Sequence, residues 1–391
     1  MIKLPTELSL DNVWVRVNSD ALSANARALL SYLGADQSSS PKLMAVVKAN
    51  GYGHGAAMAA KAFRDGGATW FGVTTLSEAL ELVESGIDSH KTPILVFAPL
   101  ISRLQCETAI RSGIHVTACD LGHVDLLSRS AEELDAKAEV HLKLDTGMSR
   151  LGLPSSEAFK AAMALQLNNN LNLTGVYTHF ATASESSLAT KYKQLAAYSG
   201  FCDSLRNAGV DGFIRHCSNS SALLRLPEAR MDLVRAGTTL YGQYPSAQCP
   251  RVPGLISDTI ALEARVVFVH DLPSGAAVGY GAEYVTRRPT RAAVLPVGFY
   301  DGVSMRPASV SCGLRGLKQM VSTVFKPQPL SVRFYGSVAP VIGRVAMQMI
   351  VVDVTGASTP IQEGDIAVVP ARRLAINASL PRVLCEPEGA T

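Results

Sequence analysis

Residues 43–55, Leu-Met-Ala-Val-Val-Lys-Ala-Asn-Gly-Tyr-Gly-His-Gly, join an apolar run to a glycine-rich loop through Lys48. The run Leu43–Lys48 is typical of a buried strand, and the loop is a turn or ligand-binding signal. The same order, a short apolar run followed by an Ala/Leu/Glu-rich helical stretch, recurs to about residue 240. The candidate strands are Leu43–Lys48, Trp70–Val73, Ile94–Phe97, Ile114–Thr117, Val140–Leu144, Leu173–Thr178, Phe213–Cys217 and Asp232–Arg235. Eight such units predict an α/β fold, a (β/α)8 TIM-type barrel rather than an open doubly wound sheet.

After about residue 250 the pattern changes to strands with little helical periodicity. The candidate strands are Ala261–His270, Ala292–Val297, Leu330–Phe334, Ala339–Val345, Met349–Val354 and Ile366–Val369. We therefore expect a barrel over residues 12–250 and a mainly β C-terminal domain over 251–391, with residues 1–11 packing on the second domain. Residues 303–329, rich in Ser, Gly and basic side chains, are predicted to form a surface insertion.

Composition excludes several classes of protein. The 391 residues are 47% hydrophobic and 18% charged, which is enough for sizeable cores and argues against disorder. The net charge of +3 is scattered, so no nucleic-acid partner is expected. The best apolar run, Pro93–Pro99, is strand-sized, and no membrane association is predicted. Seven cysteines without a C-x-x-C pair, behind an N-terminus without a signal peptide, indicate a reducing cytoplasm.

Polar residues gather where the predicted barrel strands end, which is where barrels carry their functional groups. They are Lys48, Lys143 with Asp145 and Arg150, His179, Asn219 with Ser220, and Arg235 with Gly237 and Thr238. A lysine at a barrel mouth can form a Schiff base with an aldehyde, and the last two loops are the usual phosphate site of this fold. Together they suit pyridoxal 5′-phosphate (PLP). Singly, each has a structural alternative: a salt bridge for Lys48, an ion pair of Lys143 with Asp145, a core position for His179, and a plain turn for the loop glycines.

Longer motifs make this chain similar to the alanine racemase family of PLP enzymes, and they occur in the family's order over roughly residues 12–355. The motifs are residues 45–55, 143–152, 178–181, 216–220, 234–237, 240–242, 278–281, 301–302 and 343–347. The resemblance implies a racemase that interconverts L- and D-alanine with two bases in a homodimer with shared active sites. No metal site is expected, because the cysteines have no metal-ligand spacing.

The resemblance also implies residue roles. Lys48 would carry PLP and act as one base, and Tyr280 of the partner subunit would be the other. Arg235 would face the pyridine nitrogen with His179 supporting it, and Arg150 with the backbone of Met347 would bind the substrate carboxylate. Lys143 matches a position often carbamylated in the family. The cofactor, above all its phosphate, would be held by Tyr52, Asn219, Ser220, Gly237, Thr238 and Tyr241.

Four departures from the family pattern concern the substrate entrance. Gln348 and Ser184 stand where Asp is usual, Phe299 stands where Tyr is usual, and no Tyr follows Tyr335. Serine or another small amino acid is thus an alternative substrate, and a PLP-binding member with little turnover a further one. A PLP decarboxylase of the same fold is the rival enzyme, which Arg235 disfavours because that class places an acid at the ring nitrogen. A non-catalytic PLP carrier is disfavoured by the second domain.

Overall fold

The computed structural model describes residues 10–34, 40–181, 189–305 and 330–385, which form two compact units. One unit is Ser19–Thr259, and the other combines Met1–Asn18 with Ile260–Thr391. The division therefore differs from the expected 12–250 and 251–391. The reason is strand β1 (Val13–Val17), which pairs antiparallel with β10 (Ile260–Arg265) and parallel with β19 (Arg382–Leu384). Backbone hydrogen bonds thus assign this N-terminal strand to the β unit.

The first unit is the predicted barrel, and all eight expected strands are present. They are β2 (Lys42–Val46), β3 (Trp70–Val73), β4 (Ile94–Val96), β5 (Val116–Ala118), β6 (Ala138–Lys143), β7 (Leu171–Tyr177), β8 (Ile214–His216) and β9 (Leu233–Ala236). They form two parallel arcs, β4-β3-β2-β9 and β5-β6-β7-β8. A parallel bridge between Leu95 and His115 joins the arcs at one seam. At the other, Asp232 N–H donates to Arg215 O (3.2 Å) and Arg235 N–H to Ser218 O (3.3 Å). The ring is closed, which confirms the barrel.

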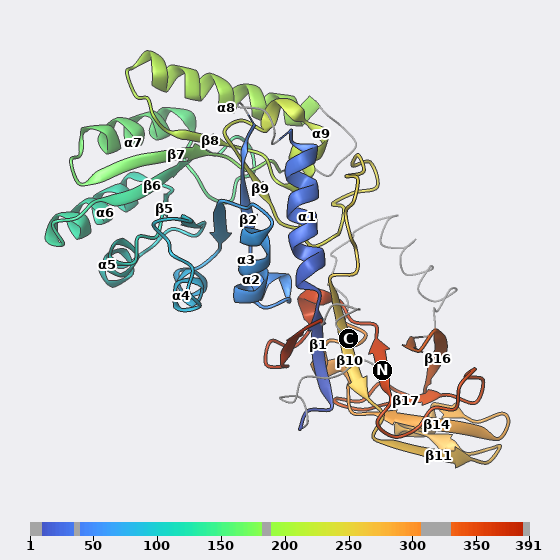
Figure 1. Ribbon diagram of the computed structural model, residues 1–391. Coiled ribbons are helices and arrows are strands. Elements are labelled where there is room, and N and C mark those ends of the chain that lie inside the picture. The colour runs from blue at the N-terminus through green and yellow to red at the C-terminus, as the bar shows by residue number, and fades with distance from the viewer. Residues whose placement is uncertain (1–9, 35–39, 182–188, 306–329, 386–391) are drawn as a thin grey trace. The chain divides into compact units, whose positions relative to one another are not determined.

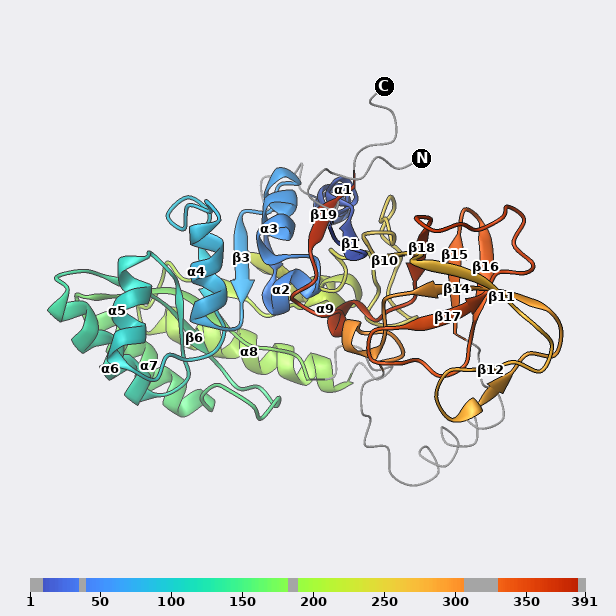
Figure 2. The ribbon, with the colours of Figure 1, turned by 90° about the horizontal axis from the view of Figure 1, so that it is seen from below.

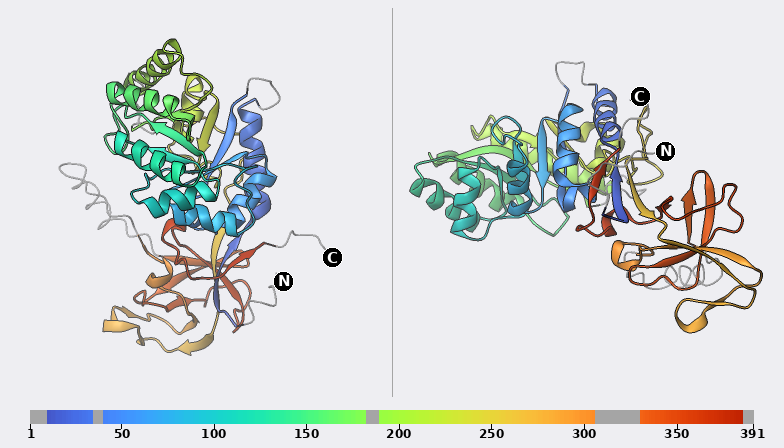
Figure 3. Two further views of the ribbon diagram at one scale, coloured as in Figure 1. Left: turned by 90° about the vertical axis from the view of Figure 1, so that its left-hand side faces the viewer. Right: turned by 60° about the horizontal axis from the view of Figure 1, so that its bottom comes forward.

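Helices cover the outside of these strands (Figures 1 and 2). In the left view of Figure 3 the helices from α1 to α8 surround the strands. Their bounds are α1 (Ser19–Tyr32), α2 (Lys48–Tyr52), α3 (Ala56–Asp65), α4 (Leu76–Glu84), α5 (Arg103–Arg111), α6 (Leu121–Glu133), α7 (Ser155–Leu167), α8 (Ala189–Asn207) and α9 (Ser220–Arg225), with a 3₁₀ turn at Pro227–Ala229. Several begin at side-chain caps, the strongest being the capping box of Thr75 and Glu78 at α4.

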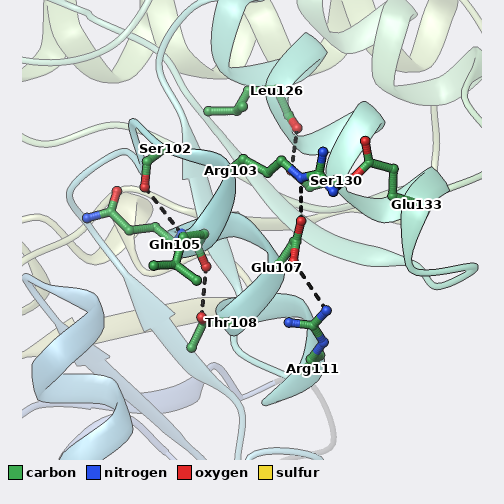
Figure 4. Close-up of polar contacts among 10 residues, drawn as sticks. Ser102, Arg103, Gln105, Glu107, Thr108, Arg111, Leu126, Ser130 and Glu133 are labelled. Carbon is green, nitrogen blue, oxygen red and sulfur yellow. Dashed lines mark hydrogen bonds and ion pairs between the residues drawn. The ribbon is translucent and has the colours of Figure 1, made fainter.

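The outer face of α5 and α6 illustrates a solvated helix pair (Figure 4). Glu107 pairs with Arg103 at 2.5 Å and with Arg111 at 3.2 Å, one turn away on either side, while Arg103 also meets Glu133 of α6. Such exposed pairs order side chains but contribute little to stability. This face therefore carries no sign of a site.

The second unit is built on a nine-stranded sheet in the order β11-β14-β17-β16-β15-β18-β10-β1-β19. The strands not yet located are β11 (Phe268–Leu272), β14 (Thr290–Leu295), β15 (Ser331–Phe334), β16 (Ser337–Ile342), β17 (Ile350–Asp353) and β18 (Ile366–Val369). A separate hairpin of β12 (Ala277–Val278) and β13 (Tyr284–Val285) holds the 3₁₀ turn Tyr280–Ala282, and two more 3₁₀ turns lie at Phe299–Asp301 and Arg373–Ala375. The mainly β prediction is confirmed.

One predicted strand of this unit is wrong in extent. Ala261–His270 is two strands, β10 and β11, because neighbouring N–H groups bond to different partners at the break. Val266 N–H donates to Asp365 O (2.8 Å) and Val267 N–H to Val294 O (3.0 Å). The expected insertion at 303–329 lies almost wholly outside the described residues.

Candidate active site

A cavity of about 790 Å³ opens at the carboxyl end of the barrel strands. Its lining includes four basic side chains, Lys48, Lys143, Arg150 and Arg235, and no Asp or Glu among the residues that the structure describes there. The lining also brings together Tyr52, His179, Asn219, Ser220, Gly237 and Thr238. Separate sequence motifs therefore predicted most of the polar residues that line this cavity. Concentrated positive charge without carboxylates suits an anionic ligand.

Lys48 begins a short stretch of left-handed backbone. Ala49, Asn50 and Tyr52 have φ angles of 53°, 52° and 53°, and Gly51 between them has 59°. Left-handed residues other than glycine cost roughly 1–2 kcal/mol each, so the rest of the fold must hold this turn. Part of the support comes from Glu78, whose carboxylate accepts from the Ala49 N–H at 2.7 Å. Strain of this kind is concentrated at functional sites.

The Lys48 amine has an altered acidity. Burial lowers its pKa most, the charge of Arg150 lowers it further, and Glu78 acts in the opposite direction. A lower pKa leaves more of the amine neutral near pH 7, which is the form that attacks a carbonyl carbon.

Tyr52, Ser220, Gly237 and Thr238 make a small polar cradle at one wall. The Ser220 hydroxyl oxygen accepts from Gly237 N–H at 2.9 Å, which leaves its own O–H to donate. A Cβ at Gly237 would lie 2.4 Å from the Tyr52 phenol oxygen, so the glycine is what lets the phenol approach. Hydroxyl groups that line one wall of a basic cavity suit a phosphate, whose oxygens accept hydrogen bonds.

Tyr241 lies behind the cradle and does not line the cavity. It is fully buried, its ring stacks on Tyr52 at a centroid distance of 4.7 Å, and its phenol donates to Val46 O at 3.3 Å. The structure thus places Tyr241 as a support for Tyr52, whereas the family resemblance implied contact with a phosphate.

Arg235 is almost completely buried, and four of its five N–H groups are used inside the protein. Nη1 donates to His216 Nδ1 (3.1 Å) and to His216 O (2.6 Å). Nη2 donates to Thr178 O (2.7 Å) and to Cys217 O (3.3 Å). Within the part of the chain that the structure describes, Nε–H is the donor left for a ligand. A guanidinium in this setting can donate a hydrogen bond but does not give up a proton.

His179 is a neutral member of the lining. Burial lowers its pKa to about 3, and the nearby Arg235, Lys143, Arg150 and Lys48 act in the same direction. Asn219 Nδ2 lies 3.4 Å from His179 Nε2, and the Asn219 side chain also caps α9. His179 therefore offers an uncharged ring to the cavity.

Lys143 lies at the end of β6 with its amine over the Tyr177 ring, 4.7 Å from the ring centre. Burial lowers its pKa to about 8, with Arg235 the next contributor. The alternative ion pair with Asp145 does not form, because that carboxylate instead accepts from the N–H groups of residues 147, 148 and 149. Those bonds shape the loop that carries Arg150.

Two further residues, Tyr177 and Phe97, line the cavity but were not predicted from the sequence. Their position at strand ends was the available signal.

The remaining predicted site residues belong to the β unit and are exposed. Tyr280 has 72% of its surface accessible and Met347 58%. Phe299 N–H donates to Ala346 O at 3.1 Å, so Phe299 neighbours the Met347 segment. Gln348 is exposed beside Met347, and Ser184 lies outside the described residues.

Comparison with known proteins agrees with this geometry. Residues 17–245 match the N-terminal domain of alanine racemase, and residues 259–379 match its C-terminal domain. Alanine racemase 1 of Oceanobacillus iheyensis is 33% identical over 92% of this chain and 89% of its own. Alanine racemase of Desulfosudis oleivorans is 34% identical over 92% and 87%. The chain belongs to the alanine racemase family.

Solved structures of this family share the whole fold. Alanine racemase of Clostridium difficile 630 superposes with a TM-score of 0.84, at 27% identity over 98% of this chain and 97% of that one. The enzyme of Streptomyces lavendulae, a D-cycloserine producer, gives 0.80 at 30% identity over 98% of both chains. Membership of the alanine racemase family makes the protein an amino-acid racemase and disfavours both the decarboxylase and the single-barrel carrier.

In the described part of the chain, no helix is long and apolar enough to cross a membrane.

Proposed function

We propose that the protein interconverts L-alanine and D-alanine with PLP as cofactor. The observation that carries this is the barrel cavity, where the Lys48 amine and the remaining Arg235 donor line one basic space. Its relatives are named alanine racemases, which favours alanine over serine.

The cavity fits the cofactor. PLP supplies an aldehyde that joins the lysine amine and a pyridine ring that takes up electron density from the substrate's Cα. The cradle of Tyr52, Ser220, Gly237 and Thr238 would hold its phosphate, and the Lys48 amine would join its aldehyde. Arg235 Nε–H would donate to the ring nitrogen, which must then be unprotonated. An arginine at this position would therefore make the cofactor a weaker electron sink, which would favour return of the proton to Cα over side reactions.

Racemisation needs one base on each face of Cα, because a proton leaves one side and returns on the other. Lys48 would serve one face and Tyr280 of the partner subunit the other. Arg150 would bind the substrate carboxylate, with the Met347 backbone beside it. A carbamate on Lys143 would add the negative charge that braces Arg150.

A homodimer is supported by exposed apolar surface on the β unit. Phe299, Tyr300, Met347 and Met349 are between 46% and 58% exposed on adjoining segments of the β unit. Exposed apolar side chains on adjoining segments are typical of an interface. We also propose a reducing cytoplasmic setting, which the six free cysteines of the described residues support.

The test is a racemisation assay on purified protein with PLP, in which D-alanine is measured after incubation with L-alanine, and with L-serine in parallel. We expect faster turnover of alanine. Faster turnover of serine would reject the substrate, and no turnover of either with bound PLP would reject the activity.

A further inference from the structure

Three histidines form a row through the barrel, starting at Arg235. His216 Nδ1 lies 3.1 Å from Arg235 Nη1, and His216 Nε2 lies 2.9 Å from His141 Nδ1. His141 Nε2 then lies 3.3 Å from His115 Nδ1. The three rings come from β8, β6 and the residue before β5, and all are buried. The row therefore runs from the cavity layer toward the amino ends of the strands.

The direction of every hydrogen bond in the row follows from Arg235, which can only donate. His216 must accept at Nδ1, so a neutral ring carries its proton on Nε2 and donates to His141 Nδ1. By the same logic His141 carries its proton on Nε2 and donates to His115. The cation thus sets the direction of the row, and each acceptor further along stabilises the same tautomer in the ring before it.

The environment keeps these rings neutral. Burial lowers the pKa of His115 to about 4 and the pKa values of His141 and His216 well below the ordinary value, and Arg235 acts the same way on the last two. Lys143 also opposes a charge on His216, whereas Glu139 favours one on His115, against His90.

The barrel makes room for the row. A Cβ at Gly175, the partner of His141 on β7, would lie 2.3 Å from His141 Nδ1. Trp70 of the core packs edge-on against His115 and His141, at centroid distances of 5.0 and 5.6 Å. In the described residues no three ligating side chains are arranged to hold a metal ion, so the row is not a metal site.

The histidine row stabilises the buried positive charge of Arg235. No carboxylate among the described residues pairs with this buried guanidinium; its partners are three carbonyl oxygens and one imidazole nitrogen. A buried cation without compensation is costly. Aligned imidazoles present their negative nitrogen toward the cation, and each hydrogen bond in such a chain polarises the next. The cation is stabilised while the cavity keeps its positive charge.

We propose that His115 and His141 are positioning residues: as acceptors further along the row they stabilise the His216 tautomer that Arg235 requires, and thereby help hold Arg235 at the cavity wall. They replace the carboxylate that would otherwise orient an arginine, and that carboxylate would weaken the attraction for an anionic ligand. The inference rests on the proposed function for the group that Arg235 meets, but the row itself is a property of the protein alone.

The first test needs neither cofactor nor substitution. Nitrogen-15 labelling of the eight histidines, followed by long-range proton–nitrogen correlation spectra of the cofactor-free protein, reports each tautomer. We expect His141 and His216 as neutral Nε2–H forms that do not titrate between about pH 6 and 9. An Nδ1–H form or a charged ring at either position would overturn the proposal.

The second test compares two variants at the far end of the row whose side chains have the same number of heavy atoms and the same branching. His115→Asn keeps an oxygen near the Nδ1 position, whereas His115→Leu removes the acceptor. We expect His115→Leu to mix the tautomers of His141 and His216 and to lower kcat about tenfold with little change in KM, while His115→Asn stays near wild type. Trp70→Phe controls for packing and should lower Tm without changing a tautomer.

Equal kcat values and equal tautomers in His115→Leu and His115→Asn would overturn the role of the row. If the wild-type protein shows the expected tautomers but no racemase activity with bound PLP, the proposed function fails and the row stands. Should His115→Leu not fold, Gly175→Ala, which displaces the His141 ring, is expected to give the same tautomer mixing.

Discussion

The two units present their candidate site residues in opposite ways. In the barrel, Arg235, Lys143 and Ser220 are 3%, 5% and 7% exposed and are held by hydrogen bonds or ring contacts. In the β unit, Tyr280 and Met347 are 72% and 58% exposed. Buried and fixed groups suit a preformed cofactor site, and exposed groups suit a surface that a partner completes. The difference separates cofactor binding, which we assign to the barrel, from the second proton transfer, which we assign to the β unit.

Removing Lys48 should have the largest effect and should act on both functions. Lys48→Ala is expected to abolish covalent attachment of PLP and to lower kcat/KM by at least about 10⁴-fold. Borohydride reduction followed by peptide mass analysis locates the attachment. Lys42→Ala, at the other end of β2, is the control and should remain labelled at Lys48. Labelling of another lysine in the wild-type protein would contradict the assignment.

Removing the Tyr280 hydroxyl should affect proton transfer, which we assign to the β unit, and leave cofactor binding in the barrel unchanged. Tyr280→Phe is expected to lower kcat by about 10²–10⁴-fold, the range for a lost general base, without changing PLP binding. Loss of the Cα proton should slow far more for one alanine enantiomer than for the other, as measured by exchange with deuterated water. Tyr335→Phe, at 66% exposure in the same unit, should behave as wild type. Equal slowing for both enantiomers would reject the two-base division.

A side chain at Gly237, in the cradle, should weaken PLP binding, which we assign to the barrel, without affecting proton transfer by the β unit. The Cβ of Gly237→Ala would press on the Tyr52 phenol, which Tyr241 holds from behind. We expect PLP affinity to fall about 10–100-fold, with kcat largely restored at saturating PLP. Fluorescence titration with PLP measures the affinity. Gly200→Ala, in the open on α8, is the control and should leave it unchanged. Unchanged PLP affinity in Gly237→Ala would contradict the assignment of the cradle as the phosphate site.

Carbamylation of Lys143 should have the smallest effect on activity, and the rate of carbamylation should depend on pH. Only a neutral amine takes up carbon dioxide, and with a pKa of about 8 the neutral fraction of Lys143 rises as pH rises through that value. Protein depleted of carbon dioxide should therefore regain activity with bicarbonate by a few-fold, and faster at pH 9 than at pH 7 when the concentration of dissolved carbon dioxide is the same. Lys143→Arg, which cannot be carbamylated, should not respond. An equal bicarbonate response in that variant would exclude Lys143 as the site.

The sequence predicts regular elements and linear motifs well, because both are local. The eight barrel strands coincide with the predicted segments, which are rich in apolar residues, and the strand-end residues follow from them. Strand β1 was missed, since its partners β10 and β19 are far away in sequence. The glycines of residues 51–55 indicate a turn, but nothing local predicts positive φ at Ala49 and Tyr52. The position of Tyr241 behind Tyr52, and the histidine row, depend on packing between strands that spacing does not encode.

The division of labour between the units is tested most directly by mixing two inactive variants. Lys48→Ala lacks the barrel's base and Tyr280→Phe lacks the β unit's base, so a hybrid dimer of shared sites contains one intact site. After subunit exchange, verified by co-purification of differently tagged chains, we expect about a quarter of wild-type activity. Full exchange with no recovered activity would contradict a site shared between subunits.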